Sequence, residues 1–113
     1  YININKYKVK LMTKWPGSHT WVVPTEITPN WITGKNKSVA IRMSSHPIIK
    51  EICKKFRGAI VSTSANIQGE RPLMTKEEIQ GVFGDLTIVD GVVGSHKGPT
   101  PIQDVETNKW LRE

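Results

Sequence analysis

The stretch GAIVSTSANIQG, residues 58–69, joins an apolar run to a cluster of small polar residues. The apolar part, residues 59–61, predicts a buried β-strand. The polar part presents the hydroxyls of Ser62 and Ser64, the amide of Asn66 and accessible backbone N–H groups. Such groups suit a ligand that carries phosphates or a carboxylate. Ser, Asn and Gly are also ordinary turn formers, so on this segment alone a plain turn is the simpler interpretation.

Strand and helix patterns alternate on the N-terminal side of this stretch. Residues 20–23 and 38–43 are rich in β-branched and apolar residues and predict two strands. Apolar residues at helical spacing predict a helix over residues 46–57, with Ser45 as its cap and Gly58 at its end. The sequence does not decide between a short helix and an extended segment for residues 1–14.

The C-terminal side continues the alternation. A capping-box pattern at residues 75–78 predicts a short helix that runs to Phe83. Residues 86–89 predict a further strand, and residues 100–112 predict two short strands around a turn at residues 107–108. These elements together predict an α/β or α+β fold, a single domain with a mixed sheet.

Residues 24–37 contain proline, glycine, asparagine and threonine and are predicted to form a loop, anchored to the body by Trp31 and Ile32. The four tryptophans, at positions 15, 21, 31 and 110, are expected to be core or loop anchors. Base stacking is the alternative role for them.

The composition describes a soluble globular chain of one domain, with 113 residues, 37% apolar residues and a formal charge of +6. The charge favours polyanionic partners such as nucleotides or RNA, although scattered basic residues also describe an ordinary solvated surface. Cys53 is the sole cysteine, which excludes an internal disulfide. No membrane-spanning run or signal-peptide pattern is present in the sequence, and we expect a cytoplasmic protein without a membrane partner.

Few standard catalytic motifs are present. No spacing of His, Cys or acidic residues suits a structural metal site, and the sequence has neither a P-loop nor a dinucleotide-binding glycine motif. His19, His46 and His96 are isolated, and His46 before Pro47 is best explained as a helix cap or a solvent-facing residue. Arg42 ends a predicted strand, on the same strand face as Ser38. Its guanidinium can hold a carboxylate or phosphate, or form a surface ion pair.

Three separated motifs resemble the YrdC/TsaC family. They are WPG at residues 15–17 with Thr20, VAIR at residues 39–42 before His46-Pro47, and STSAN at residues 62–66 with Gly69 and Pro72. The resemblance implies a twisted mixed sheet with flanking helices and a concave basic cavity. It also implies a nucleotidyltransferase that makes threonylcarbamoyl-adenylate and pyrophosphate from L-threonine, bicarbonate and ATP. The product serves the N6-threonylcarbamoyladenosine modification of tRNA.

The same resemblance implies the residues of the site. ATP would contact Ser38, Ser64, Asn66 and Arg112, and threonine would contact Arg42, Ser62 and Thr100. No residue serves as a nucleophile, and Mg²⁺ would accompany the ATP phosphates. The implied partners are the proteins that transfer the threonylcarbamoyl group to tRNA, and tRNA or other structured RNA.

The chain departs from the family pattern in two places. It lacks the family's Pro-Thr-Glu-Thr-like segment and a Lys-x-Arg motif in the proper context, and Ser18 and His19 stand where proline and an apolar residue are usual. Residues 1–113 therefore resemble the C-terminal two-thirds of the domain, and we expect this chain alone to be catalytically incompetent. A non-catalytic RNA-binding module or an inactive fragment of the family is the alternative.

Overall fold

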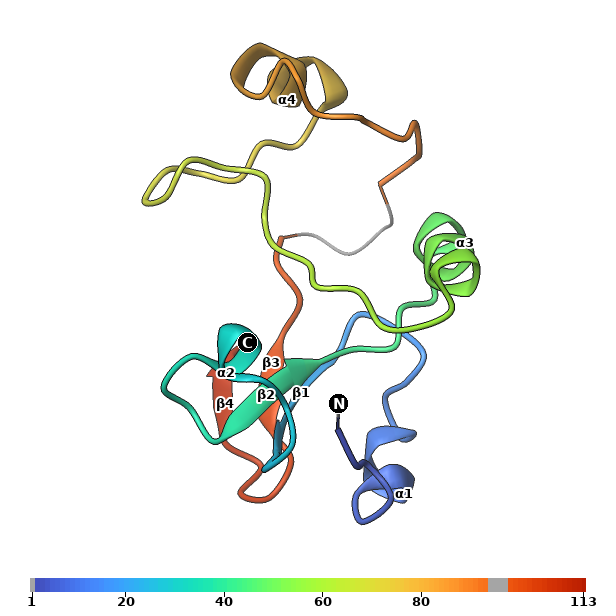
Figure 1. Cartoon of the computed structure of the whole chain (residues 1–113), viewed down its shortest axis with the longest axis vertical. Helices are drawn as coiled ribbons and strands as arrows, with labels where there is room; N and C mark the ends of the chain where they lie inside the picture. The colour runs from blue at the N-terminus through green and yellow to red at the C-terminus, as the bar shows by residue number, and fades with distance from the viewer. Residues whose placement is uncertain (1, 94–97) are drawn as a thin grey trace. The chain divides into compact units, whose positions relative to one another are not determined.

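The computed structural model describes residues 2–93 and 98–113, which form two compact units (Figure 1). The first unit combines Tyr1–Gly58 with Gly94–Glu113, and the second is Ala59–Val93. His96 lies outside the described residues. The helices and the sheet confirm the predicted α/β class, whereas the concave basic cavity stays a prediction.

The first unit is built on a four-stranded mixed sheet of order β2-β1-β3-β4. Its strands are β1 (Thr20–Pro24), β2 (Ser38–Ile41), β3 (Ile102–Asp104) and β4 (Trp110–Arg112). β1 pairs antiparallel with β2 and parallel with β3, and β3 pairs antiparallel with β4. All four strands were predicted from the sequence, although β2 ends at Ile41 rather than at Met43.

A small core packs against this sheet. Leu11, Trp15, Trp21, Val23 and Val105 are buried, and Leu11 and Val23 are fully inaccessible to solvent. Leu11 comes from α1 (Lys8–Leu11), so the N-terminal segment contains a short helix. Two hydrogen bonds tie this segment to the C-terminal hairpin: Lys10 Nζ donates to the Val105 carbonyl (2.6 Å), and the Tyr7 hydroxyl donates to Glu106 Oε2 (3.0 Å).

The β3–β4 hairpin turns at the predicted position. Asp104 Oδ1 accepts hydrogen bonds from the backbone N–H groups of Glu106 (2.8 Å) and Thr107 (2.9 Å). Asn108 adopts φ 64°, a left-handed conformation that asparagine tolerates better than most residues. The side chain of Asp104 therefore replaces part of the backbone pairing that the tight turn removes.

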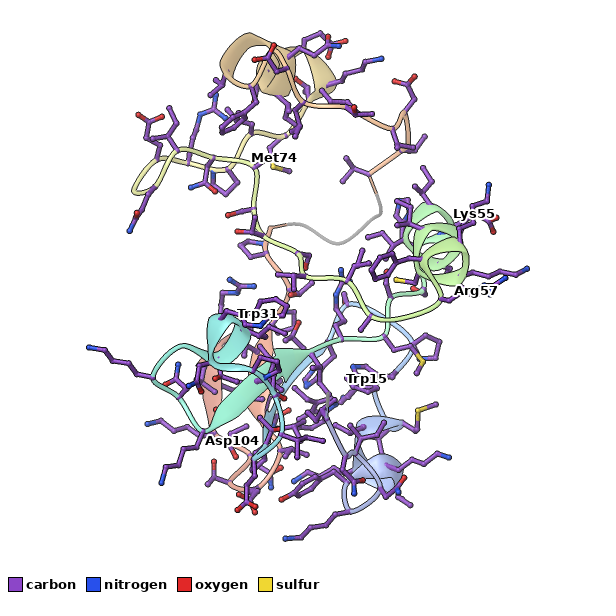
Figure 2. The ribbon with its side chains drawn as sticks, viewed as in Figure 1. Trp15, Trp31, Lys55, Arg57, Met74 and Asp104 are labelled. Atoms are coloured by element: carbon purple, nitrogen blue, oxygen red, sulfur yellow. The ribbon has the colours of Figure 1, made fainter. Side chains whose placement is uncertain are left out.

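The segment predicted as an anchored loop contains a short helix, α2 (Asn30–Thr33). The prediction that Trp31 anchors it is wrong, because the Trp31 side chain is 75% exposed (Figure 2). Thr33 is the buried residue of this helix. Trp110 is also partly exposed, so the expectation of buried anchors holds for Trp15 and Trp21.

Both ends of the predicted central helix, α3 (Pro47–Phe56), are shifted by one residue. His46, not Ser45, is the N-cap, and its side chain accepts a hydrogen bond from the Ile48 N–H (3.2 Å). Arg57, not Gly58, takes the left-handed conformation at the C-terminal end (φ 62°). The Gly58 N–H then reaches the Cys53 carbonyl, as in a Schellman motif. No helix in residues 2–93 and 98–113 could span a membrane.

The second unit contains one helix, α4 (Lys76–Val82), among its described residues. Thr75 Oγ1 accepts from the Glu78 N–H (3.2 Å), and Glu78 Oε2 accepts from the Met74 N–H (3.0 Å). This reciprocal arrangement confirms the predicted capping pattern, although the carboxylate reaches the residue before the cap.

The two strands predicted in the second unit are not formed. Residues 59–61 and 86–89 lie outside any β-ladder, and Val61 and Val89 are 72% and 62% exposed. A short apolar run becomes a strand only when a neighbouring strand pairs with it and one face is covered. The local sequence supplies the propensity but not the pairing, and this is why the buried-strand prediction for the stretch before Ser62 is wrong.

Candidate functional site

The sheet of the first unit brings several chain segments together at one end. Thr20 begins β1 and is the register partner of Ile102, which is in turn the partner of Arg112 in β4. On the other side, Trp21 pairs with Ile41, and continuing this register by one residue places Arg42 beside Thr20. Because β2 and β4 run antiparallel to β1 and β3, their C-terminal ends meet the starts of β1 and β3.

Two hydroxyls occupy the centre of this end of the sheet. Thr20 Oγ1 lies 3.0 Å from Thr100 Oγ1, within hydrogen-bond distance. The Thr20 N–H also donates to the Pro101 carbonyl (3.0 Å), which fixes the two segments against each other. Thr20 is nearly buried, whereas Thr100 is partly exposed. A hydroxyl pair of this kind offers both a donor and an acceptor to a ligand.

Arg112 lies on one side of the hydroxyl pair that Thr20 and Thr100 form. Its Nε donates to the Thr100 carbonyl (2.8 Å), and Nη2 lies 3.4 Å from Thr100 Oγ1. The Arg112 residue is exposed, so its remaining N–H groups are available to an anion. The sequence analysis assigned Thr100 and Arg112 to two different ligands, and the structure places them in direct contact.

A β-bulge in β4 changes the directions in which the side chains of that strand point. Trp110 pairs with Gln103 and Arg112 pairs with Ile102, so three residues of β4 face two residues of β3. Bulges of this type redirect side chains that regular alternation would place on one face. Trp110 lies against the ring of His19, whereas Arg112 reaches Thr100.

Arg42 lies at the other side of the same end. Its Nη1 approaches the Gly17 carbonyl at 3.4 Å, and the Gly17 N–H donates to the Met43 carbonyl (2.8 Å). A Cβ at Gly17 would come within 3.1 Å of the Lys14 carbonyl, so the close turn favours glycine. Arg42 is exposed, and no carboxylate of the described residues pairs with it. We call Thr20, Arg42, Thr100 and Arg112 the sheet-end cluster.

Ser38 is not part of this cluster. It pairs with Pro24, the last residue of β1, whereas Arg42 follows the opposite end of β2. The two residues are therefore separated by about 13 Å along the strand. Ser38 was expected beside ATP, and within the first unit it lies away from Arg112.

The remaining predicted site residues belong to the second unit. The Ser64 hydroxyl donates to Asn66 Oδ1, and Asn66 Nδ2 donates to the carbonyls of Ile67 (2.9 Å) and Glu70 (3.1 Å). Ser62 and Ser64 are exposed. The Asn66 side chain thus holds the loop in shape through these hydrogen bonds. Ser62 and Ser64 lie on the surface of that loop. Ser62 and Ser64 have the chemistry to contact a ligand, and Asn66 has the geometry to shape their loop.

Two residues were not predicted from the sequence as part of the site: Thr20, which belongs to the sheet-end cluster, and His19, which lies beside it. Thr20 was noted only as part of a motif, yet its hydroxyl contacts Thr100; strand alternation next to the WPG turn was the available signal. His19 is 93% buried, since its exposure is 7%, and its ring lies 4.5 Å from that of Trp21. Burial lowers the pKa of His19, the charge of Lys14 acts in the same direction, and the Gln103 side chain opposes the shift.

The cluster is suited to anions rather than to a metal ion. It combines two guanidinium groups with two hydroxyls and contains no carboxylate. In residues 2–93 and 98–113 no group of three His, Cys, Asp or Glu side chains could hold a metal. Guanidinium groups favour phosphates and carboxylates, which they can bind through two parallel hydrogen bonds.

Comparisons with known proteins agree with the motifs. The family model Sua5_yciO_yrdC, described as "Telomere recombination", matches residues 1–113. Threonylcarbamoyl-AMP synthases of Yersinia enterocolitica, Yersinia pestis and Yersinia pseudotuberculosis are each 41% identical over 105 residues. The matched region covers 91% of this chain and 55% of each relative, so the chain spans about half the length of these proteins. The chain therefore belongs to the Sua5/YciO/YrdC family.

Proposed function

We propose that this chain contributes the sheet-end cluster and the loop of Ser62 and Ser64 to a threonylcarbamoyl-AMP synthase. In that reaction the amino group of L-threonine attacks bicarbonate, forming a carbamate and releasing water. A carbamate oxygen then attacks the α-phosphorus of ATP, and the bond to the β-phosphate oxygen breaks to release pyrophosphate. ATP, bicarbonate and the product are anions and threonine carries a carboxylate, so the reaction needs cationic groups that hold these groups in line.

The contact between Arg112 and Thr100 is the observation that carries this proposal. A guanidinium held by a backbone carbonyl keeps its remaining N–H groups in a fixed direction, as a preorganised anion site requires. In the proposal Arg112 contacts ATP, and Arg42 with Thr100 contacts the threonine carboxylate and hydroxyl. The synthase names of the 41%-identical relatives support the proposed reaction.

The second unit by itself carries candidate binding hydroxyls. Its Ser62 and Ser64 hydroxyls, which the family resemblance assigns to threonine and to the nucleotide, lie on the loop that Asn66 shapes. Ser38 contacts the nucleotide from the far end of β2. Mg²⁺ enters with the ATP phosphates and neutralises part of their charge, since Mg²⁺ commonly binds through substrate phosphates and water.

Pyrophosphate release tests the activity. The native protein that carries this sequence is supplied with ATP, L-threonine and bicarbonate, and each is then omitted in turn. We expect release only when all three are present. Release that persists without threonine would contradict the proposal. The variant Trp31→Ala serves as a control, because the exposed Trp31 lies outside the cluster and its removal should leave the rate unchanged.

A non-catalytic RNA-binding role is the second candidate. It rests on the formal charge of +6 and on the exposed basic residues on and beside α3, which are Lys50, Lys54, Lys55 and Arg57. Figure 2 labels Lys55 and Arg57. Such a surface binds phosphates without sequence preference and releases them as salt is added. Titration with tRNA at increasing salt tests it, with Lys54→Glu/Lys55→Glu as the variant. An affinity that does not change with salt, or is equal in the variant, would remove this candidate.

A further inference from the structure

His19 is linked to each segment that contains a residue of the sheet-end cluster, either directly or through one intermediate residue. It precedes Thr20 in the chain, and its carbonyl accepts a hydrogen bond from Trp15 Nε1 (2.8 Å). Trp15 begins the turn whose Gly17 bonds to Met43 and approaches Arg42. The ring of His19 lies 5.5 Å from that of Trp110, two residues before Arg112, in an edge-to-face arrangement.

The surroundings of the imidazole suit a neutral ring. Trp21 packs against it at 4.5 Å, and Nε2 is buried without a hydrogen-bond partner among the described residues. The charged groups around this packing are cations: Lys14 acts on the ring, and Lys10 Nζ lies 5.8 Å from the Trp21 ring centre. Gln103 is the polar neighbour, and its side chain is uncharged.

The Asp104 carboxylate of the adjacent strand is engaged elsewhere, in the hairpin turn. Of the described residues, none places a carboxylate within ion-pair distance of the His19 ring. A second proton on the imidazole would therefore add a buried charge near the Lys14 cation, which is unfavourable even though the Gln103 side chain favours the protonated ring.

We propose that His19 is a positioning residue for the sheet-end cluster: its neutral imidazole, packed against Trp21 and Trp110, holds β1 and β4 in the register in which Arg112 contacts Thr100. Protonation of His19 expels the ring from this packing. The displacement of Trp110 then moves Arg112, which is joined to it through the bulge of β4. His19 itself touches no substrate, so it acts on binding only through Arg112 and Thr20.

The proposal rests on the proposed function only where ligand binding is concerned, and its first test needs no ligand. The Nε–H signal of Arg112 is followed by ¹H–¹⁵N NMR in the full chain from pH 7.5 to 5.5, with assignment by Arg112→Lys. In the wild-type chain we expect the signal to shift or broaden as the pH falls. In His19→Leu and His19→Gln, which cannot be protonated at this position, it should stay constant.

His46→Asn is the matched control, because it removes another histidine while asparagine retains a side-chain cap for α3. It should behave as the wild-type chain. An Arg112 signal that responds to pH equally in the wild type and in both His19 variants would overturn the proposal. Two His19 variants are used so that a folding failure of one, seen by circular dichroism, leaves the other to decide.

Binding of ATP to the same proteins separates this inference from the proposed function. Between pH 7.5 and 5.5 we expect a several-fold greater loss of affinity in the wild type than in His19→Leu, and the comparison cancels the protonation of ATP itself. Equal losses would overturn the role of His19 in binding. Absence of ATP binding at every pH would contradict the proposed function, and the NMR result would then decide the inference about His19 alone.

Discussion

Arg112 Nε donates to the Thr100 carbonyl at 2.8 Å, which joins the last strand of the sheet to the segment that enters β3. Thr100 in turn reaches Thr20 through a hydroxyl contact of 3.0 Å. The chain of contacts runs across three strands, and it fixes one guanidinium beside two hydroxyls. Arg42, the residue after β2, flanks the same end. Strand pairing therefore brings residues that are far apart in the sequence to one end of the sheet.

Replacing Arg112 by lysine tests the fixed direction of the guanidinium. Lys keeps the positive charge but cannot form the planar, two-point contact. We expect the affinity for ATP to fall about tenfold, since one charge-assisted hydrogen bond is lost. Isothermal titration calorimetry measures the change. An affinity equal to that of the wild type would show that charge alone matters at this position.

Replacing Arg42 by alanine tests its proposed role with threonine. We expect the KM for threonine to rise roughly 10- to 100-fold, because a bidentate contact to a carboxylate is removed. Arg42 is exposed, so the free energy of unfolding should change by less than about 0.5 kcal/mol. Steady-state kinetics and urea denaturation are both measured on the native protein that carries this sequence. A loss of stability that parallels the loss of activity would instead indicate a structural role.

Leu11 is predicted to be a main contributor to the stability of the first unit. Its side chain is inaccessible to solvent, and Leu11→Ala should lower the free energy of unfolding by about 2–5 kcal/mol. Val9, on the same short helix, is 87% exposed. Val9→Ala should therefore change the free energy of unfolding by less than about 0.5 kcal/mol. Urea denaturation followed by tryptophan fluorescence compares the two. Equal effects would contradict the packing of α1 on the sheet.

Arg57 occupies a left-handed backbone position (φ 62°), which glycine adopts without steric cost. Arg57→Gly should therefore stabilise the chain by about 1 kcal/mol. Lys55→Gly, inside the last turn of α3, should destabilise it by about 1 kcal/mol. Thermal denaturation of the two variants provides the comparison. A lower melting temperature for Arg57→Gly would show that helix α3 does not end in this way.

Asp104 makes the stability of the β3–β4 hairpin depend on pH in the acid range. The backbone N–H of Thr107, and then that of Glu106, lower the pKa of Asp104 below its ordinary value. The unfolded chain thus takes up this proton before the folded chain does, so the stabilisation is complete at neutral pH and is lost as the pH falls through the folded pKa. Asp104→Asn should flatten this part of the stability curve between pH 5 and pH 2. An unchanged acid slope would place the effect on another carboxyl group.

The sequence by itself determined the family and most of the elements of the first unit. Each of these follows from neighbours in the chain, as the turn at Asn108 and the β-branched run of β1 illustrate, and so does the cap pattern before α4 in the second unit. The family resemblance also predicted Arg42, Thr100 and Arg112 as site residues. Local sequence was insufficient to predict the conformation of residues 59–61. The apolar run is present there, but no strand pairs with it.

Only the tertiary structure decided which of these residues meet. The contact between Thr100 and Arg112 depends on the pairing of β3 with β4 and on the bulge between them. The position of Ser38 at the far end of the sheet, and of Arg42 beside the start of β1, depends on the antiparallel direction of β2. The burial of His19 depends on Trp21 and Trp110, which come from strands that are distant in the sequence. Strand register is a property of pairs of segments, and for this reason no single segment could reveal it.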